Sequence, residues 1–422
     1  MENFKVFKFG GASLSDPSQI RKTIAILDLY PNEKIVLVVS AMGKTTNLLE
    51  NVVKEYFNDP ISALNLFLQI KQAHLNIANE FGITNIDQIV DIEDTFAEGI
   101  WLLEDEPHDP YDYVYDQIVS LGELICSKLV YYYALNKNLS IGYVDARDVI
   151  KTDESHRSAK IDWESTSKSI DSVLKPMLGL FDIVITQGFI GSTVDNNNTT
   201  LGREGSDFTA SVIGSCIGAS EVVVWKDVIG IMSADPKLDN TATKIDKLDY
   251  SEMIEMSYFG AKVLHPKTIK PLVSKNIPLL VNSYLNPLNK GTEIANFGTL
   301  NYPVIKIVQE NQCLIKISPT DYSFVSENHL KQIFGIIDEL KIKIFVMRNT
   351  ALHFLFSTDY ELENLDRLIE RLDNIFNVTI EQDLKLVTIR HEVDSKNQFN
   401  QNEIVFEEKF EKTRHLLIKT IL

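Results

Sequence analysis

A glycine-rich segment near the N-terminus could bind phosphate. Residues 8–13 read Lys-Phe-Gly-Gly-Ala-Ser and lie between an expected strand and an expected helix. Two glycines let backbone N–H groups approach a phosphate closely, and the lysine supplies a mobile positive charge. The segment could therefore cradle the β- and γ-phosphates of ATP. On these residues alone, a plain Gly-Gly turn beside a solvated lysine is an equally good interpretation.

A second segment, residues 200–207, combines glycines with a guanidinium, a hydroxyl and a carboxylate. It reads Thr-Leu-Gly-Arg-Glu-Gly-Ser-Asp and precedes the helix-like run 208–218. Arg203 offers bidentate binding to a carboxylate, which a lysine cannot match. Asp207 could cap the helix and still take part in chemistry. We therefore favour a functional role for this segment.

Residues 40–46, Ser-Ala-Met-Gly-Lys-Thr-Thr, superficially match a P-loop. That motif needs another glycine five residues before Gly43, and Val38 stands there, so we reject it. What remains is a polar loop with hydroxyls and free N–H groups, suited to a small carboxylate. Ordinary capping of the following helix explains the same residues equally well.

Three more segments carry polar or cationic residues after an apolar stretch. Residues 225–231 and 233–237 could hold a nucleotide base or ribose, although Asp-Pro-Lys is also a common turn. Lys262 follows a glycine among apolar residues, so its ammonium either snorkels to solvent or is aimed at a ligand. His265 has no metal-ligand partner at suitable spacing, and no metal cluster or Ser-His-Asp order is evident. A metal, if used, should arrive with a nucleotide.

The elements that must position these segments form two patterns. Over the first ~295 residues, short apolar strands alternate with amphipathic helices, which predicts an α/β domain with a largely parallel sheet. The expected strands are 6–9, 35–39, 183–186, 222–224 and 278–281, and a mainly helical insertion is expected near 51–133. Ligands of open α/β sheets bind at the carboxyl ends of strands, where most of these segments lie.

After residue 296 the order becomes β-α-β-β-α-β, typical of a ferredoxin-like unit. The expected strands are 314–317, 344–347, 352–356 and 384–389, and the expected helices are 329–340 and 361–376. Leucines spaced by three or four residues give the second helix one apolar face.

Composition limits the class of protein. The 422 residues allow two or three domains, and 44% apolar with 24% charged residues is typical of a folded globular protein. With 59 acidic against 41 basic residues, the net charge of −18 argues against a general nucleic-acid or anionic-membrane partner. Three scattered cysteines, no signal-peptide pattern and no apolar run of ~18 residues predict a cytoplasmic protein.

Taken together and in this order, the motifs resemble the aspartate kinases of the amino-acid kinase family. The segments that carry the resemblance span essentially the first 295 residues: 8–11, 120–123, 201–203, 205–207, 225–228 and the nearly diagnostic octapeptide 259–266, Phe-Gly-Ala-Lys-Val-Leu-His-Pro.

The resemblance implies a fold and a domain arrangement. It implies a three-layer amino-acid-kinase sandwich with a mainly parallel sheet over residues 1–295, and an ACT-like regulatory and dimerisation region of ferredoxin-like α+β type over 296–422. One complete ACT unit is expected at about 310–391, with a truncated remainder at 392–422 that could supply a strand or helix to a partner's unit. A homo-oligomer, with a dimer through this region, and a possible amino-acid effector follow as expectations.

The resemblance also implies an activity: ATP-dependent phosphorylation of the β-carboxylate of L-aspartate to 4-phospho-L-aspartate, the first step of lysine, threonine and methionine biosynthesis. Mg²⁺ would be carried by ATP. The substrate's own carboxylate is ionised at neutral pH and attacks the γ-phosphorus, so no general base is needed.

Residue roles are carried over by position. The catalytic residues would be Lys8, Asp207 and Lys262. The substrate-binding residues would be Thr46, Glu123, Arg203 and Ser206. The nucleotide-binding residues would be Gly10, Gly11, Ser13, Lys226, Asp227, Asp235 and Lys237.

Four positions depart from the family pattern. Ala12 replaces Thr or Ser, and Lys237 replaces Arg, both mild changes. Lys226 replaces a threonine, which puts the nucleotide contact at that position in question because a long cation cannot copy a hydroxyl. Glu204 replaces a common glycine and adds a negative charge to a loop that meets anions. The alternatives are a kinase of another small acid, such as glutamate or acetylglutamate, or a catalytically weak amino-acid sensor.

Overall fold

The computed structural model describes residues 3–392 and 400–420, which form two compact units. The first unit contains the chain up to Ile231 together with Asp246–Met253 and Leu264–Gly298. The second contains Met232–Ile245, Ile254–Val263 and the chain from Thr299. The division between compact units is therefore not a single break near residue 295.

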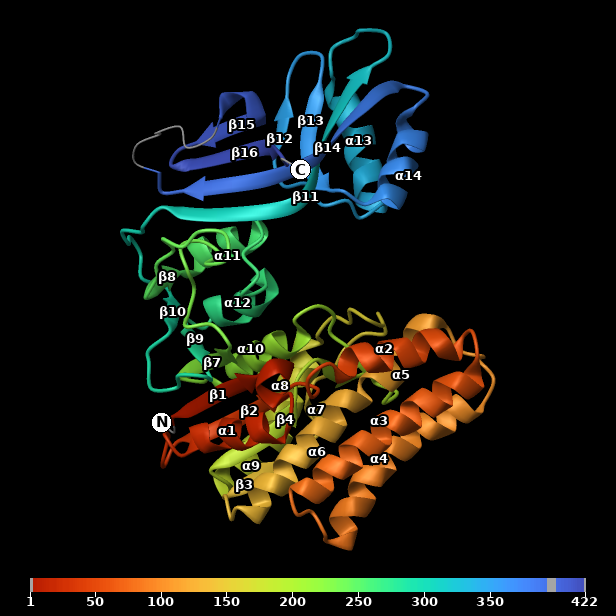
Figure 1. The fold of residues 1–422 in the computed structure, drawn as a ribbon, viewed down its shortest axis with the longest axis vertical. Helices are drawn as coiled ribbons and strands as arrows, with labels where there is room; N and C mark the ends of the chain where they lie inside the picture. Colours follow the sequence, from red (N-terminus) through yellow and green to blue (C-terminus); the bar gives the residue numbers. More distant parts are fainter. Residues whose placement is uncertain (1–2, 393–399, 421–422) are drawn as a thin grey trace. The chain divides into compact units, whose positions relative to one another are not determined.

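The first unit is built on a mostly parallel sheet with the strand order β3-β4-β2-β1-β7-β9-β10-β8 (Figure 1). Only β9 and β10 pair antiparallel among the neighbours in this sheet of the described chain. The strands are β1 (Phe4–Phe9), β2 (Lys34–Val39), β3 (Ile141–Tyr143), β4 (Ile183–Gln187), β7 (Glu221–Lys226), β8 (Lys247–Asp249), β9 (Leu279–Ser283) and β10 (Thr292–Ala295). All five strands expected for this region are confirmed.

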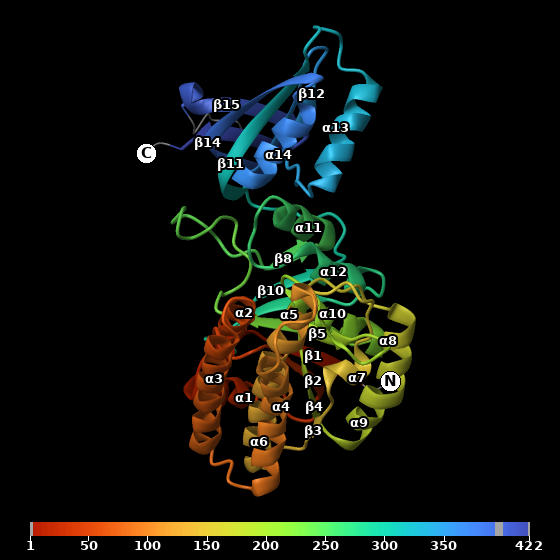
Figure 2. The ribbon, with the colours of Figure 1, turned by 90° about the vertical axis from the view of Figure 1, so that its right-hand side faces the viewer.

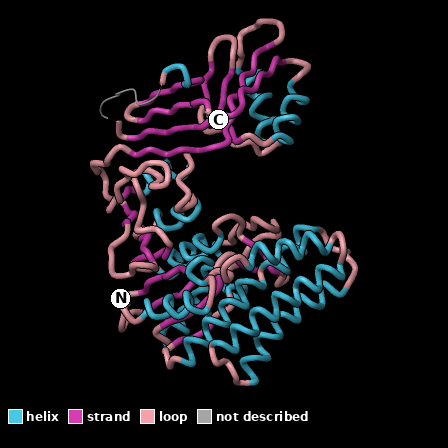
Figure 3. The backbone as a smooth tube through the Cα atoms, in the orientation of Figure 1, coloured by secondary structure: helices cyan, strands magenta, loops and turns pink. Residues whose placement is uncertain are grey.

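Helices cover both faces of this sheet, because its central strands are continuous apolar runs that must be buried on both sides. Figure 2 shows α3, α4 and α6 on one side of the strands and α7, α8 and α9 on the other, and Figure 3 shows the alternation of strand and helix. The helices are η1 (Gly11–Leu14), α1 (Pro17–Leu27), α2 (Thr45–Tyr56), α3 (Pro60–Glu80), α4 (Ile86–Glu104), α5 (Tyr111–Val119), α6 (Leu121–Asn136), α7 (Ala146–Val149), α8 (Trp163–Ser169), η2 (Ile170–Leu174), α9 (Lys175–Leu180), α10 (Gly205–Ile217) and α12 (Pro266–Val273). The helix α11 (Tyr250–Tyr258) begins in the first unit and ends in the second. This is the predicted three-layer α/β sandwich, with the predicted helical insertion formed by α2 to α6.

The helix α6 is buried along most of its length within this insertion. Among the described residues, Tyr111–Asn136 is long and apolar enough to cross a membrane by length and composition alone. However, 78% of its most apolar window is buried in the fold, as in the core helix of a soluble protein.

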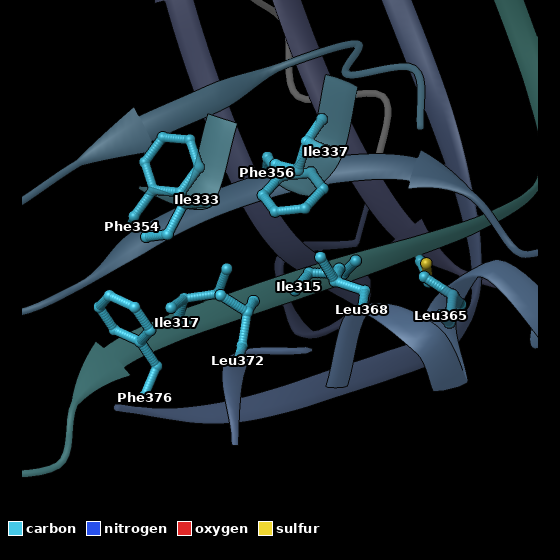
Figure 4. Packing of buried hydrophobic residues seen from close by; sticks show 11 residues of the cluster. Ile315, Ile317, Ile333, Ile337, Phe354, Phe356, Leu365, Leu368, Leu372 and Phe376 are labelled. Atoms are coloured by element: carbon cyan, nitrogen blue, oxygen red, sulfur yellow. The ribbon is translucent and has the colours of Figure 1, made fainter. Parts of the chain in front are cut away.

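The second unit contains the predicted ferredoxin-like order. Its elements are β11 (Ile305–Pro319), α13 (Glu327–Glu339), β12 (Met347–Asn349), β13 (Phe354–Asp359), α14 (Leu362–Leu372) and β14 (Phe376–Arg390). The sheet order is β12-β13-β11-β14-β16-β15, in which every pairing is antiparallel. Both helices pack on one face through the apolar cluster shown in Figure 4, with Leu365, Leu368 and Leu372 supplied by α14.

The C-terminal remainder extends this same sheet. After the short helix η3 (Gln401–Glu403), β15 (Ile404–Phe410) and β16 (Thr413–Lys419) form a hairpin, and β16 pairs with β14 of its own chain. These two strands make their ladder hydrogen bonds within the chain and β15 forms the edge of the sheet, so the expectation that the remainder serves a partner's unit stays a prediction. Residues 393–399, 421 and 422 of the predicted remainder lie outside the described residues.

Two segments that precede residue 295 pack in the second unit. The backbone N–H of Lys306 donates to the carbonyl of Ser233 at 2.7 Å. Arg390 pairs with Glu255 at 3.1 Å, and the ring of Phe259 lies 4.4 Å from that of His415. These contacts link Met232–Ile245 and Ile254–Val263 to the strands of the second sheet.

We expect Leu368→Ala to destabilise the second unit by about 2–5 kcal/mol, because truncation of a fully buried leucine loses transfer free energy and leaves a cavity. Leu362→Ala is the matched control on the same helix, since Leu362 is 60% exposed. Denaturant unfolding, followed by circular dichroism, measures both variants. Equal losses in the two variants would contradict this packing.

Candidate functional site

The carboxyl end of β1 carries Lys8 into a tight glycine turn. A Cβ on Gly11 would lie 2.7 Å from the carbonyl oxygen of Gly43, and the N–H of Gly43 donates to the carbonyl of Gly11 at 3.1 Å. Only a glycine permits this approach of the two loops. A Cβ on Gly10 would lie 3.2 Å from the Lys8 ammonium, so the glycine also leaves room for that group.

The Asp207 carboxylate binds two lysine ammonium groups. Asp207 lies in the first turn of α10 and is buried; Lys8 Nζ is 2.6 Å from its Oδ1, and Lys226 Nζ, at the end of β7, is 2.9 Å from its Oδ2. Burial opposes ionisation, but the charges and hydrogen bonds of the two lysines lower the pKa of Asp207 below its usual value. We call Lys8, Asp207 and Lys226 the Asp207 cluster.

Glu123 presents a second buried carboxyl group near the same strand end. It lies in the first turn of α6, and its Oε1 accepts from the backbone N–H of Ala41 at 3.3 Å. Its Oε2 has no hydrogen-bond partner among the described residues. Burial raises the pKa of Glu123 to about 8, although the Ala41 N–H and the charge of Lys8 act in the opposite direction.

The loop before α10 holds Arg203 and Glu204. Arg203 is exposed, whereas Glu204 is half-buried with a left-handed φ of 53°. Burial raises the pKa of Glu204, and the positive charge of Lys226 counteracts this increase.

Lys267 binds the backbone of the loop that holds Arg203 and Glu204, and the sequence did not single out this lysine. Its ammonium donates to the carbonyl of Leu201 at 2.6 Å and lies 5.2 Å from the centre of the Phe208 ring. Burial lowers the pKa of Lys267, with the charge of Glu204 opposing. Its place directly after His265-Pro266, at the start of α12, was the available signal.

Asp116 is another buried carboxylate that sequence reasoning did not single out. It accepts from Thr200 Oγ1 at 2.6 Å and from the backbone N–H of Arg157, and it lies 3.0 Å from His156 Nδ1. Thr200 ends β6 (Asn198–Thr200), which pairs with β5 (Ile190–Ser192) and leads into the Arg203 loop. Asp116 therefore anchors the backbone that presents Arg203.

The remaining predicted residues of the first unit lie on neighbouring loops. Thr46 is the second residue of α2 and partly exposed, and Asp227 follows β7 and is exposed. Ser206 is buried beside Asp207, close enough to Gly188 that a Cβ there would lie 2.5 Å from its own Cβ. The hydroxyl of Ser13 is buried and donates to the carbonyl of Gly10 at 2.7 Å, so it stabilises the glycine turn.

Three predicted site residues belong to the second unit. Asp235 and Lys237 lie in Met232–Ile245, and Lys262 lies in Ile254–Val263. All three side chains are exposed.

The described part of the first unit thus offers a buried, lysine-paired carboxylate at the carboxyl edge of a parallel sheet. The described residues contain no group of three or more His, Cys, Asp or Glu side chains placed to hold a metal ion, and both oxygens of Asp207 are occupied by lysines. Ammonium groups fixed in this way suit stabilisation of a transferring phosphoryl group, which needs positioning and positive charge more than a covalent nucleophile.

The sequence matches a family of known kinases and is similar to known aspartokinases. Residues 3–283 match the amino acid kinase family. The chain is 29% identical over 405 residues to lysine-sensitive aspartokinase 3 of Escherichia coli (strain K12), covering 92% of this chain and 87% of that protein. It is 28% identical over 416 residues to chloroplastic aspartokinase 2 of Arabidopsis thaliana, covering 91% and 73%.

Solved structures agree over almost the whole chain. Aspartokinase III of E. coli in complex with aspartate and ADP superposes with a TM-score of 0.79 at 27% identity, covering 99% of this chain and 96% of that chain. The same enzyme in complex with lysine and aspartate gives a TM-score of 0.78, also at 27% identity with the same coverage.

The raised pKa of Glu123 predicts a pH-dependent effect on stability. The folded protein keeps a proton that the unfolded chain releases near pH 4.5, so Glu123 lowers the free energy of unfolding as pH rises from about 5 to 8. Glu123→Gln stays neutral. The unfolding free energy of this variant minus that of the wild type should therefore increase over this range, at about 1.4 kcal/mol per unit of pKa difference.

Differential scanning calorimetry at several pH values measures this difference. Glu106→Gln is the control, because it makes the same substitution at an exposed side chain. A difference for Glu123→Gln that does not change with pH would show that the carboxyl group is not held protonated.

Proposed function

The chain belongs to the amino acid kinase family, and on this premise we propose that it is an ATP-dependent aspartate kinase. It phosphorylates the β-carboxylate of L-aspartate to 4-phospho-L-aspartate. The observation that supports this most directly is the Lys8–Asp207 ion pair at the carboxyl edge of the sheet. The chain that carries this ion pair is similar to two aspartokinases, over 92% and 91% of its length.

The chemistry requires no general base. The β-carboxylate is ionised at neutral pH and attacks the γ-phosphorus of Mg-ATP, whose Mg²⁺ travels with the nucleotide as part of the substrate. Lys8 neutralises charge on the transferring phosphoryl group, and Asp207 fixes the position of that ammonium. Lys262 provides a further cation in the catalytic set.

The aspartate zwitterion is bound by groups of opposite charge. Arg203 binds the α-carboxylate, for which a planar guanidinium is well suited. Glu123 binds the α-ammonium, with Thr46 and Ser206 completing the pocket. Because burial favours the protonated form of Glu123, binding of the ammonium draws the proton off this carboxyl group.

The nucleotide is bound by the glycine turn and by polar loops. Gly10 and Gly11 bring backbone N–H groups to the phosphates, and Ser13 supports them through its hydrogen bond to Gly10. Asp227, Asp235 and Lys237 border the nucleotide.

The biological setting follows from the activity. The enzyme catalyses the first step of lysine, threonine and methionine biosynthesis and acts in the cytoplasm. The second unit serves as an ACT-like regulatory region, which supports a homodimer and binding of an amino-acid effector. The E. coli relative in complex with lysine and aspartate is the comparison that supports an effector.

Trapping of the acyl phosphate tests the function directly. We expect the purified protein with Mg-ATP, hydroxylamine and L-aspartate to form aspartyl hydroxamate. Glutamate and acetylglutamate should give little product, and product with one of them instead would assign a sibling kinase. Absence of hydroxamate with all three acids, alongside intact folding, would leave the amino-acid sensor.

We expect Lys8→Met to reduce kcat by about 10²–10³, the scale for removal of one preorganised charge-stabilising group. Lys5→Met is the control on the same strand, because Lys5 pairs with Glu33 and Glu221 and not with Asp207. Steady-state kinetics by the hydroxamate assay measures both variants. Near-normal turnover by Lys8→Met would refute the role of Lys8.

A further inference from the structure

Two charged residues of the first unit, Lys226 and Glu204, are 22 positions apart in the sequence. Lys226 ends β7, and Glu204 directly precedes α10. Lys226 Nζ lies 2.9 Å from Asp207 Oδ2, and the positive charge of Lys226 acts on the carboxyl group of Glu204. Both residues therefore belong to the surroundings of Asp207.

The ammonium groups of Lys226 and Lys8 share one anionic partner. The Lys226 ammonium is held by the carboxylate that also binds Lys8, through the other oxygen. One carboxylate therefore holds both ammonium groups, one on each oxygen. Two ammonium groups held in this way can both donate hydrogen bonds to the oxygens of one phosphoryl group. The Lys226 side chain is 21% exposed and that of Lys8 is 10% exposed, so each retains access to a ligand.

We propose that Lys226 is a second cation for the γ-phosphoryl group of ATP, not a contact to the base or ribose, and that Glu204 balances its charge before the nucleotide binds. This inference rests on the proposed function only in that the chain transfers a phosphoryl group from ATP. It goes further by assigning a catalytic role to Lys226 on the basis of its contact with Asp207.

The surroundings of Glu204 support the second half of the proposal. Its backbone adopts a left-handed φ of 53°, a conformation that suits glycine and is uncommon for other residues. Its Oε2 is buried without a hydrogen-bond partner among the described residues. With both carboxyl groups ionised, two lysines and two carboxylates give a neutral set. Loss of Lys226 alone would leave Asp207 and Glu204 facing one ammonium group.

The first experiment compares affinities for ADP and for a non-hydrolysable ATP analogue, without an acceptor. Calorimetry should show that Lys226→Thr weakens the analogue about tenfold, equivalent to ~1.4 kcal/mol, while ADP changes far less. Lys5→Thr should leave both affinities unchanged. Equal weakening of ADP and analogue by Lys226→Thr would mean a base or ribose contact and would overturn the proposal.

A second variant guards against loss of folding. Lys226→Gln keeps a hydrogen-bond donor toward Asp207 without the charge, and it should show the same selective loss of analogue affinity. In turnover, we expect Lys226→Thr to lower kcat by about 10² and to raise KM for ATP by about the same factor of ten as for the analogue. Unchanged analogue affinity and kcat in a folded Lys226→Gln variant would overturn the assignment.

The role of Glu204 is tested by rescue. We expect Glu204→Gly in the Lys226→Thr background to restore part of the lost kcat, because it removes the unbalanced carboxylate. A double variant no better than Lys226→Thr would refute the charge balance.

The binding measurement separates this inference from the proposed function. Wild-type protein that binds the ATP analogue but forms no aspartyl hydroxamate would refute aspartate as substrate, and the affinity ratio would still decide the role of Lys226. Failure of the wild type to bind the analogue at all would refute both.

Discussion

The first unit depends on the compensation of one buried negative charge. Asp207 is buried, and an unpaired carboxylate in that position would cost several kcal/mol. Two ammonium groups at 2.6 and 2.9 Å remove this cost. Because Lys8 comes from β1, Lys226 from the neighbouring strand β7 and Asp207 from the start of α10, one charge requirement fixes the relative positions of three elements.

The close approaches around this cluster follow from the same requirement. The Gly11 turn and the Gly43 loop approach so closely that a Cβ would collide, and Gly188 leaves room for Ser206 directly before Asp207. A side chain at Gly11 or Gly188 would separate the strand ends and move Asp207 or Lys8. The two glycines therefore maintain the short distance between Lys8 and Asp207 as well as the shape of the turns.

The sequence predicted the repetitive part of this architecture well, because local periodicity reports burial. Five of the eight strands of the first sheet, the helical insertion and the ferredoxin-like order were foreseen, whereas the short strands β3, β8 and β10 were not. The pairing of strands that are far apart in the sequence was not foreseen. The hairpin of β15 and β16 joins β14 through hydrogen bonds that no local sequence pattern encodes. The partners of Lys226 and Lys267 were missed for a related reason, since a long cationic side chain at a strand or helix end can reach many acceptors.

Lys8 acts on two buried carboxyl groups whose pKa values shift in opposite directions. Asp207 receives two ammonium groups directly, so its pKa falls despite burial. Glu123 receives one backbone N–H and the charge of Lys8 without a direct ion pair, so burial dominates and its pKa rises to about 8. Such divergence assigns different tasks to similar groups. Asp207 therefore favours the ionised form that its two lysines compensate, whereas Glu123 favours the protonated form, in which its burial leaves no unpaired charge. In a chain with a net charge of −18, two ammonium groups are thus held together at the carboxyl edge of the sheet by one carboxylate.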